Sequence, residues 1–145
     1  MTLLLGSTLL RAGFGFTLLV PILGEFMELK INVRKLSDDI SVVDCAGRLV
    51  FGEETAALRD QVKSLVSENA RIVLSLGDVT YIDSGGLGTL VALYTTAQNA
   101  GASVKLARLT KRVGDLLQVT KLLTVFEVYD SEEAAVMSFR KGAAA

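Results

Sequence analysis

The fold of this chain is decided by the stretch Tyr81-Ile82-Asp83-Ser84-Gly85-Gly86-Leu87-Gly88. Residues 72–76 before it form a short, dense apolar run with β-branched members, which is typical of a central strand covered on both faces. Apolar residues after it recur at helical spacing: Leu87, Leu90, Val91 and Tyr94. Ser84 is therefore predicted at the turn where a buried strand gives way to a helix, close to free backbone N–H groups that tolerate an added phosphate. This position favours a regulatory switch over a catalyst.

The composition indicates one globular domain that lacks the residues of several common kinds of site. The chain has 145 residues, 50% of them hydrophobic, which suffices for a real core. Its net charge is −1, from 15 basic and 16 acidic residues, and no charge run stands out, so nucleic acid is not an expected partner. Histidine is absent, which excludes a Ser-His-Asp triad and a histidine-based zinc site. No metal, cofactor or catalytic residue is predicted.

The single cysteine, Cys45, lies in the apolar run of residues 40–46 and cannot form an internal disulfide. A buried inert thiol is the favoured interpretation over a nucleophile. This cysteine usage fits a reducing cytoplasm, which is the predicted location of the protein.

Residues 1–26 differ from the rest of the chain, because they are rich in Leu, Gly and Phe and carry only two charged side chains. The apolar stretch at residues 14–23 is shorter than the roughly 20 residues of a spanning helix, and Pro21 would strain a helix interior. Three interpretations stay open for this N-terminal extension: an upstream addition before a natural start at Met27, a membrane anchor or signal, and an ordered accessory segment.

The rest of the chain predicts one domain at residues 27–140, followed by a frayed tail at residues 141–145. Strands are predicted at residues 29–36, 40–46, 72–76, 104–107 and 125–129. Helices are predicted at residues 53–67, from the Ser84 turn to about residue 100, at 111–119, and from residues 130–133 through 139. Ser131 or Asp130 is the predicted N-cap of the last helix. The order β-β-α-β-α-β-α-β-α indicates an α/β fold, with a mixed β-sheet and helices packed against it.

Residues 27–139 resemble a STAS domain of the anti-sigma factor antagonist (anti-anti-sigma factor) type. The resemblance rests on the stretch from Asp83 to Gly88, which is similar to the family signature Asp-Ser-Ser/Ala/Thr-Gly-Leu-Gly. It also rests on Gly47-Arg48-Leu49 after the second predicted strand and on the order of the elements. The similarity covers nearly the whole chain beyond residue 26, so it implies a STAS-like fold.

The resemblance implies a phosphorylation switch at Ser84 and no enzymatic activity of the domain itself. An anti-sigma factor that is also a serine kinase of the GHKL ATPase type binds the unphosphorylated domain and so releases its sigma factor. Phosphorylation of Ser84 breaks the complex, and a serine phosphatase resets it. The surface implied in partner binding lies around the serine and in the loop after the second strand, residues 49–55. The residues singled out in it are Asp83, Ser84, Gly85, Gly86, Gly52, Glu53 and Glu54.

The glycines of the turn are predicted to have steric roles. Gly85 and Gly86 would leave the shoulder beside Ser84 bare for a kinase, and Gly88 would let the helix pack closely on the sheet. The chain departs from the family pattern at two positions, since Gly85 stands where Ser, Thr or Ala is usual and Lys121 where Gly is frequent. We expect the first departure to loosen the turn, and the second to alter the end of the short helix without touching the switch.

Plainer structural roles stay open for the same residues. Ser84 can serve only as an N-cap, Asp83 can cap the turn, and Glu53 and Glu54 can be partners of a helix dipole. A second function also stays open, a non-switching STAS subunit of a membrane lipid- or anion-transport system, although direct membrane binding is not expected. A phosphate-binding enzyme is disfavoured, because the stretch lacks a Walker ending and the GxGxxG spacing.

Overall fold

The computed structural model describes residues 29–68 and 70–144 of the chain. The strands of this part are β1 (Leu29–Lys35), β2 (Ile40–Leu49), β3 (Arg71–Ile82), β4 (Ser103–Ala107) and β5 (Val128–Tyr129). Its helices are α2 (Glu53–Ser67), α3 (Ser84–Asn99), α4 (Lys111–Val119) and α5 (Glu132–Ala144), with a short 3₁₀ helix, η1 (Leu122–Thr124). Residues 1–26, with their three interpretations, and the suggested start at Met27 lie outside the described residues.

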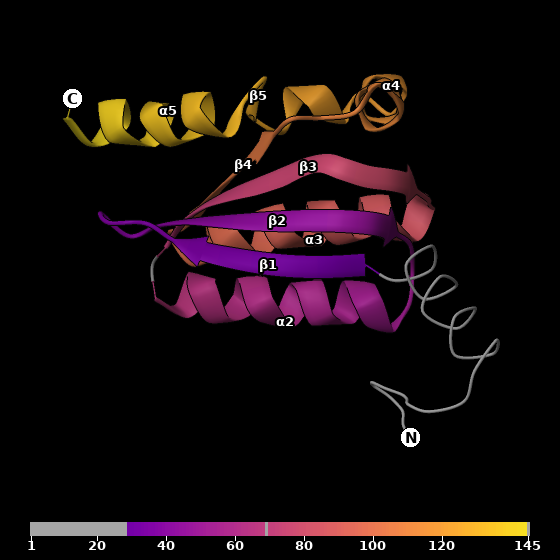
Figure 1. Ribbon diagram of the computed structural model, residues 1–145, viewed down its shortest axis with the longest axis horizontal. Helices are drawn as coiled ribbons and strands as arrows, with labels where there is room; N and C mark the ends of the chain where they lie inside the picture. The colour runs from indigo at the N-terminus through magenta and orange to yellow at the C-terminus, as the bar shows by residue number, and fades with distance from the viewer. Residues whose placement is uncertain (1–28, 69, 145) are drawn as a thin grey trace, which may run out of the picture.

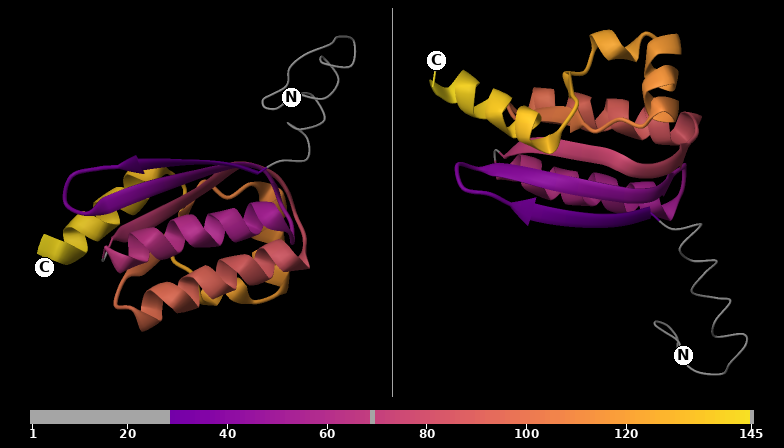
Figure 2. Two further views of the ribbon diagram at one scale, coloured as in Figure 1. Left: turned by 90° about the horizontal axis from the view of Figure 1, so that it is seen from below. Right: turned by 45° about the horizontal axis from the view of Figure 1, so that its top comes forward.

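The strands form one mixed sheet in the order β1-β2-β3-β4-β5. β1 and β2 make an antiparallel hairpin, and each later strand pairs in parallel with the one before it. Helices α2 and α3 lie on one face of the sheet, and α5 lies on the opposite face, as Figure 1 and Figure 2 show. The predicted α/β class, the mixed sheet and the order of the elements are confirmed.

Each face of the sheet carries its own hydrophobic core. The larger core joins the sheet to α2 and α3 and includes Leu58, Leu74 and Leu90, whose side chains are fully buried. The smaller core lies beneath α5 and groups Val42 and Val73 of the strands with Phe139. Burial of each such side chain contributes about 1.5–3 kcal/mol, so both helical layers are held firmly to the sheet.

The two central strands are longer than the sequence predicts. β2 continues through Gly47 to Leu49, and β3 continues to Ile82. In their parallel register Gly47 pairs with Val79 and Leu49 with Ile82, so each strand supplies hydrogen-bonding partners that keep the other extended. As a result, the loop after β2 and the turn after β3 leave the sheet at the same edge.

The last strand is shorter than predicted, because a compact turn replaces its first half. The Phe126 N–H donates to the Leu122 carbonyl at 3.3 Å. The ring of Phe126 is buried and meets the ring of Tyr94 edge-on, with 5.3 Å between the centroids. Lys121 enters this turn with a left-handed backbone (φ 64°), the conformation that favours glycine. Packing of Phe126 therefore overrides the β-propensity of the segment.

Ser131 begins the last helix, since the Ala134 N–H donates to its Oγ at 3.0 Å. Of the two N-caps that the sequence predicts, the structure shows Ser131. Helix α5 then continues to Ala144, so it extends into the tail of residues 141–145 that the sequence predicts as frayed.

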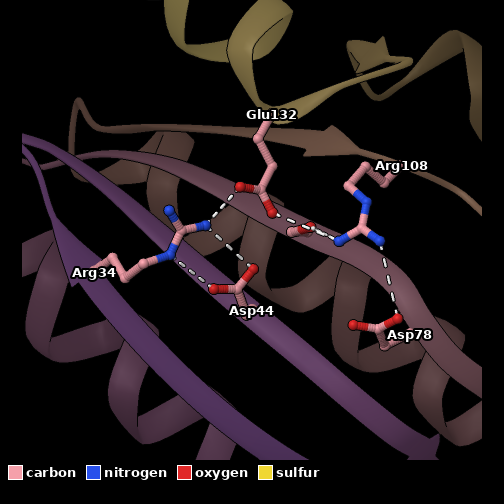
Figure 3. Close-up of polar contacts among 6 residues, drawn as sticks. Arg34, Asp44, Asp78, Arg108 and Glu132 are labelled. Carbon is pink, nitrogen blue, oxygen red and sulfur yellow. Dashed lines mark hydrogen bonds and ion pairs between the residues drawn. The ribbon is translucent and has the colours of Figure 1, made fainter.

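An ion-pair network holds the start of α5 against the sheet (Figure 3). Glu132 in the first turn of α5 accepts a hydrogen bond from Arg34 of β1 at 2.5 Å and lies 3.7 Å from Arg108. Arg34 also donates to Asp44 of β2 at 3.0 Å, and Arg108 lies 3.9 Å from Asp78 of β3. No local sequence pattern predicts this network, because Arg34 and Glu132 are 98 positions apart.

We expect Glu132 to make the free energy of unfolding depend on pH in the acid range. Partial burial raises the pKa of Glu132, but hydrogen bonds involving the Ser75 hydroxyl and the Arg34 guanidinium outweigh it and lower this pKa from 4.5 to about 2. Because the pKa is depressed in the folded state, the stabilisation is fully present above pH 4.5 and is lost as the pH falls toward 2.

Glu132→Gln is expected to lower the free energy of unfolding by about 2 kcal/mol at neutral pH, and by progressively less in acid. Urea unfolding at a series of pH values measures both effects. Glu133→Gln is the control, because it removes an exposed carboxylate from the same helical turn and should change little. A difference between wild type and Glu132→Gln that stays constant down to strongly acid pH would contradict this assignment.

Candidate functional site

Ser84 is the first residue of α3, and its side chain is exposed. The N-cap of α3 is Asp83, whose backbone is extended (φ −111°, ψ −176°) and whose Oδ1 accepts the Gly86 N–H at 2.8 Å. The capping role of Asp83 is therefore confirmed, and the alternative in which Ser84 serves only as an N-cap is wrong. The Ser84 hydroxyl makes no hydrogen bond to the described residues, so capping does not occupy it.

A second segment of the site, residues 50–52, joins β2 to α2. Gly52 is the N-cap of α2 and has φ 149°, a conformation that favours glycine. Glu53 and Glu54 occupy the first turn of α2, where the helix dipole favours carboxylates. Glu53 is exposed and Glu54 is half-buried. Glu53 and Glu54 can therefore both stabilise the start of α2 and contact a partner at the surface.

The loop after β2 and the turn before α3 lie against each other at the carboxyl ends of β2 and β3 (Figure 1). The Asp83 N–H donates to the Leu49 carbonyl at 3.3 Å. A Cβ atom added at Gly86 would lie 1.9 Å from the Leu49 oxygen, and one added at Gly85 would lie 2.4 Å from the Phe51 Cβ. The structure thus brings the two predicted partner-binding segments together at one edge of the sheet.

The glycines of this turn differ in role from the prediction. Gly85 and Gly86 do not leave a bare shoulder for a kinase, since Phe51 and the Leu49 carbonyl fill the space beside them. Gly88 does not bring α3 close to the sheet, because a Cβ atom there would meet nothing within 4 Å. The close approach that requires glycine is therefore between the helix start and the loop after β2.

Phe51 lies in the loop of residues 49–55 that the resemblance implies in partner binding, but the sequence does not single it out. Its side chain is 79% exposed although it is a large aromatic, and its backbone lies against Gly85. Aromatic side chains are enriched in protein–protein interfaces, so this ring is a candidate contact for a partner. The available signal was a phenylalanine placed directly before the N-cap glycine of α2.

Other kinds of site find little support in the described part of the chain. Cys45 is 1% exposed, and burial raises the pKa of its thiol to about 12, so the prediction of a buried inert thiol is confirmed. Across residues 29–68 and 70–141, no three His, Cys, Asp or Glu side chains are grouped to hold a metal ion. Of the helices that the structure describes, none has the length and apolar character needed to cross a membrane.

Comparison with known proteins decides the family. A sequence model of the STAS domain matches residues 31–135 of the chain. The chain belongs to the STAS domain family. This STAS domain is 30% identical over 111 residues to the anti-sigma-B factor antagonist of Bacillus subtilis (strain 168), an alignment that covers 76% of this chain and 99% of that protein.

Two solved structures show how widely the STAS fold is used. The Bacillus cell fate determinant SpoIIAA in its phosphorylated form matches 76% of this chain and 99% of its own, with a TM-score of 0.62 and 14% identity. The murine solute carrier 26 family member A9, an anion transporter, matches 86% of this chain and 24% of its own, with a TM-score of 0.64 and 16% identity. At these identities the likeness concerns the fold alone, which occurs in both a cell fate determinant and an anion transporter.

Proposed function

We propose that this STAS domain protein is a cytoplasmic anti-sigma factor antagonist whose binding is switched by phosphorylation of Ser84. The observation that supports this most strongly is the exposed Ser84 hydroxyl at the first position of α3, which stays available because Asp83 does the capping. Backbone N–H groups at a helix start accommodate an added phosphate. The Bacillus subtilis relative that is 30% identical is an anti-sigma-B factor antagonist. Such an antagonist is a regulator rather than an enzyme.

The partner in this proposal is an anti-sigma factor that is also a serine kinase of the GHKL ATPase type. It binds the unphosphorylated STAS domain and gives up its sigma factor, and a serine phosphatase later restores Ser84. The contact surface consists of the α3 turn and the start of α2: Asp83, Ser84, Gly85, Gly52, Glu53 and Glu54. Gly86 is buried, so it contributes by letting the loop after β2 close onto the turn.

The switch depends on how differently the added phosphate charge affects the free domain and the complex. A phosphoserine carries about −1.5 to −2 charges at pH 7. In the free domain, the N-terminus of α3 offsets part of that charge at Ser84. In the complex, the phosphate lies next to Asp83. It must either lose its hydration or face acidic side chains of the partner, and both are unfavourable. The affinity therefore falls sharply, while the fold changes little.

Phosphate mapping tests the proposed function directly. The purified chain is incubated with ATP and with each GHKL-type serine kinase encoded in its own genome, and the modified residue is identified by mass spectrometry. One kinase is expected to modify Ser84 and to bind only the unmodified chain. Modification at another residue, or the absence of any kinase that binds, would overturn the proposal.

A second candidate function is a non-switching STAS subunit of a membrane lipid- or anion-transport system. The murine anion transporter contains a region of the same fold, matched over 86% of this chain, so the fold is compatible with this function. In that case the chain should co-purify with a membrane transport subunit or its ATPase rather than with a soluble kinase. Ser84 should then carry no phosphate in protein isolated from its native cells.

Phe51→Ala is expected to weaken kinase binding by about 2 kcal/mol, or roughly thirtyfold in Kd, with little loss of stability. The ring is 79% exposed in the free domain, so its removal costs little folding free energy. In the complex it would be buried beside the phosphoacceptor, so its removal leaves a gap at the interface. Biolayer interferometry measures the affinity, and urea unfolding measures the stability.

Two further variants control this experiment. Met137→Ala shortens an exposed apolar side chain on α5, at 47% exposure and on the opposite face of the sheet, and should leave the affinity unchanged. Gly85→Ala keeps the Phe51 ring but forces the loop away, so we expect it to weaken binding in the same direction. Equal binding by the wild type and Phe51→Ala would remove Phe51 from the interface.

A further inference from the structure

A groove of about 630 Å³ opens between the end of β3 and α4. β4 ends at Ala107, opposite Ser75, so on the side away from β2 the last part of β3 has α4 rather than a strand beside it. The groove is lined by Tyr81 and Ile82 of β3 and by residues of α4, namely Lys111, Arg112, Asp115, Leu116 and Val119. Val119 is 79% exposed and Tyr81 is 39% exposed, so an apolar surface lies open to solvent.

Two guanidinium groups are held on one aromatic ring at this groove. The Cζ atom of Arg48 lies 5.0 Å from the centroid of the Tyr81 ring, and the Cζ atom of Arg112 lies 5.7 Å from it. Neither arginine forms an ion pair with any residue that the structure describes, whereas Lys111 is paired with Asp115 at 2.8 Å. A guanidinium that stacks on a ring keeps N–H donors free for a carboxylate. The groove therefore combines an apolar wall with the Arg112 guanidinium and a Lys111–Asp115 pair, and Arg48 adds a second guanidinium at its margin, over the Tyr81 ring. Neither guanidinium has an acidic partner in the described part of the domain.

The groove reaches residues that directly adjoin the Ser84 turn along the chain. Ile82 directly precedes the N-cap Asp83, and Arg48 directly precedes Leu49, whose carbonyl accepts the Asp83 N–H. The two neighbouring regions differ in the sign of their charge. Asp83, with Glu53 and Glu54, makes the Ser84 side acidic. On the groove side Asp115 is paired with Lys111, so Arg48 and Arg112 leave an excess of positive charge. A partner that spans both regions meets a dipolar surface, which fixes its orientation.

We infer that the groove docks an acidic and apolar segment of the same protein that binds at Ser84. Carboxylates of this segment face Arg48 and Arg112, and its apolar side chains lie on Leu116 and Val119. The identity of the partner rests on the proposed function, whereas the chemistry of the segment rests on the groove itself. Charged pairs at the rim of an interface set association rate and partner choice, so the groove selects the partner while Ser84 switches it.

The first test uses the full chain and the kinase that modifies Ser84. The double variant Arg48→Gln/Arg112→Gln is expected to bind this kinase about tenfold more weakly at low salt and to lose less affinity when the salt is raised. The matched control Lys63→Gln/Lys141→Gln removes the same charge from exposed positions on α2 and α5 and should bind like the wild type. Equal affinities of the two double variants would overturn the inference.

The second test decides the question if no kinase binds. The methyl-labelled full chain is titrated with a synthetic peptide of alternating Glu and Leu pairs, and with a counterpart in which Lys replaces Glu. Only the acidic peptide is expected to shift the methyl resonances of Leu116 and Val119, and Arg48→Gln/Arg112→Gln should abolish the shifts. No shift, or equal shifts with both peptides, would overturn the inference.

Two outcomes distinguish this inference from a lipid occupant of the groove and from the proposed function. Phosphatidylglycerol vesicles that shift the same methyl resonances, when the acidic peptide does not, would assign the groove to anionic lipid and overturn a protein segment as its occupant. If the acidic peptide binds but no kinase phosphorylates the chain, the inference about the groove is supported and only the proposed phosphorylation switch is overturned.

Discussion

Ser84→Ala is expected to abolish phosphate incorporation by the cognate kinase while leaving the complex with that kinase intact. The hydroxyl is the acceptor in the proposed switch, and it makes no hydrogen bond to the described residues, so its loss should not disturb α3. Asp83 keeps the capping hydrogen bond to the Gly86 N–H at 2.8 Å in this variant. Intact mass after incubation with kinase and ATP measures the modification, and biolayer interferometry measures the binding.

The charge itself should account for release of the partner. Phosphorylation of Ser84 is expected to cost about 4 kcal/mol at the interface, or about a thousandfold in Kd. Ser84→Asp places a single, smaller charge there, so we expect a loss of roughly tenfold to a hundredfold. An affinity of Ser84→Asp equal to that of the wild type would count against the charge mechanism.

Ser64→Ala serves as the control for both Ser84 variants. Ser64 is an exposed serine on α2, away from the α3 turn. Its replacement should change neither phosphate incorporation nor binding. Phosphate that appears in Ser84→Ala at a level near the wild type would place the acceptor elsewhere.

Gly86→Ala is expected to lower the free energy of unfolding by about 3 kcal/mol or more. A Cβ atom at this position would lie 1.9 Å from the backbone oxygen of Leu49, a distance that only movement of the backbone can relieve. That movement would also break the bond from the Asp83 N–H to the same oxygen, which joins the α3 turn to β2. Urea unfolding measures the loss, and kinase binding should fall with it.

Gly88→Ala is a matched control on the same helix. A Cβ atom there meets nothing within 4 Å, so the substitution should keep or raise the stability, by up to about 1 kcal/mol through helix propensity. Equal destabilisation by the two substitutions would show that a general effect of alanine in this turn, rather than contact with Leu49, explains the result.

Local patterns in the sequence predict much of this fold. The alternation of strands and helices follows from the spacing of apolar residues, and the order of the elements is confirmed by the sheet and its helices. The placement of Ser84 at the start of α3 also follows from local signals, since Asp83 caps the helix and Leu87 begins its apolar stripe. Such signals involve residues that are only a few positions apart, so the sequence shows them without knowledge of the tertiary contacts.

The first and last residues of the strands depend on segments that are neighbours in the fold, so local sequence patterns do not predict them. β2 extends past residue 46 because β3 pairs with it as far as Leu49, and β3 reaches Ile82 for the same reason. β5 shrinks because the segment before it turns to bury Phe126. In each case a contact between distant segments outweighs the intrinsic preference of the residues.

The sequence by itself determined the α/β class, the order of the elements, the position of Ser84 at a helix start and the burial of Cys45. Only the tertiary structure decided that Phe51 stands beside Gly85 and that Arg48 and Arg112 share the ring of Tyr81. The physical reason is the range of the forces involved. Helix and strand patterns record hydrogen bonds and burial along the chain, whereas the surface of a site is made by steric and electrostatic contacts between segments that only the folded sheet places side by side.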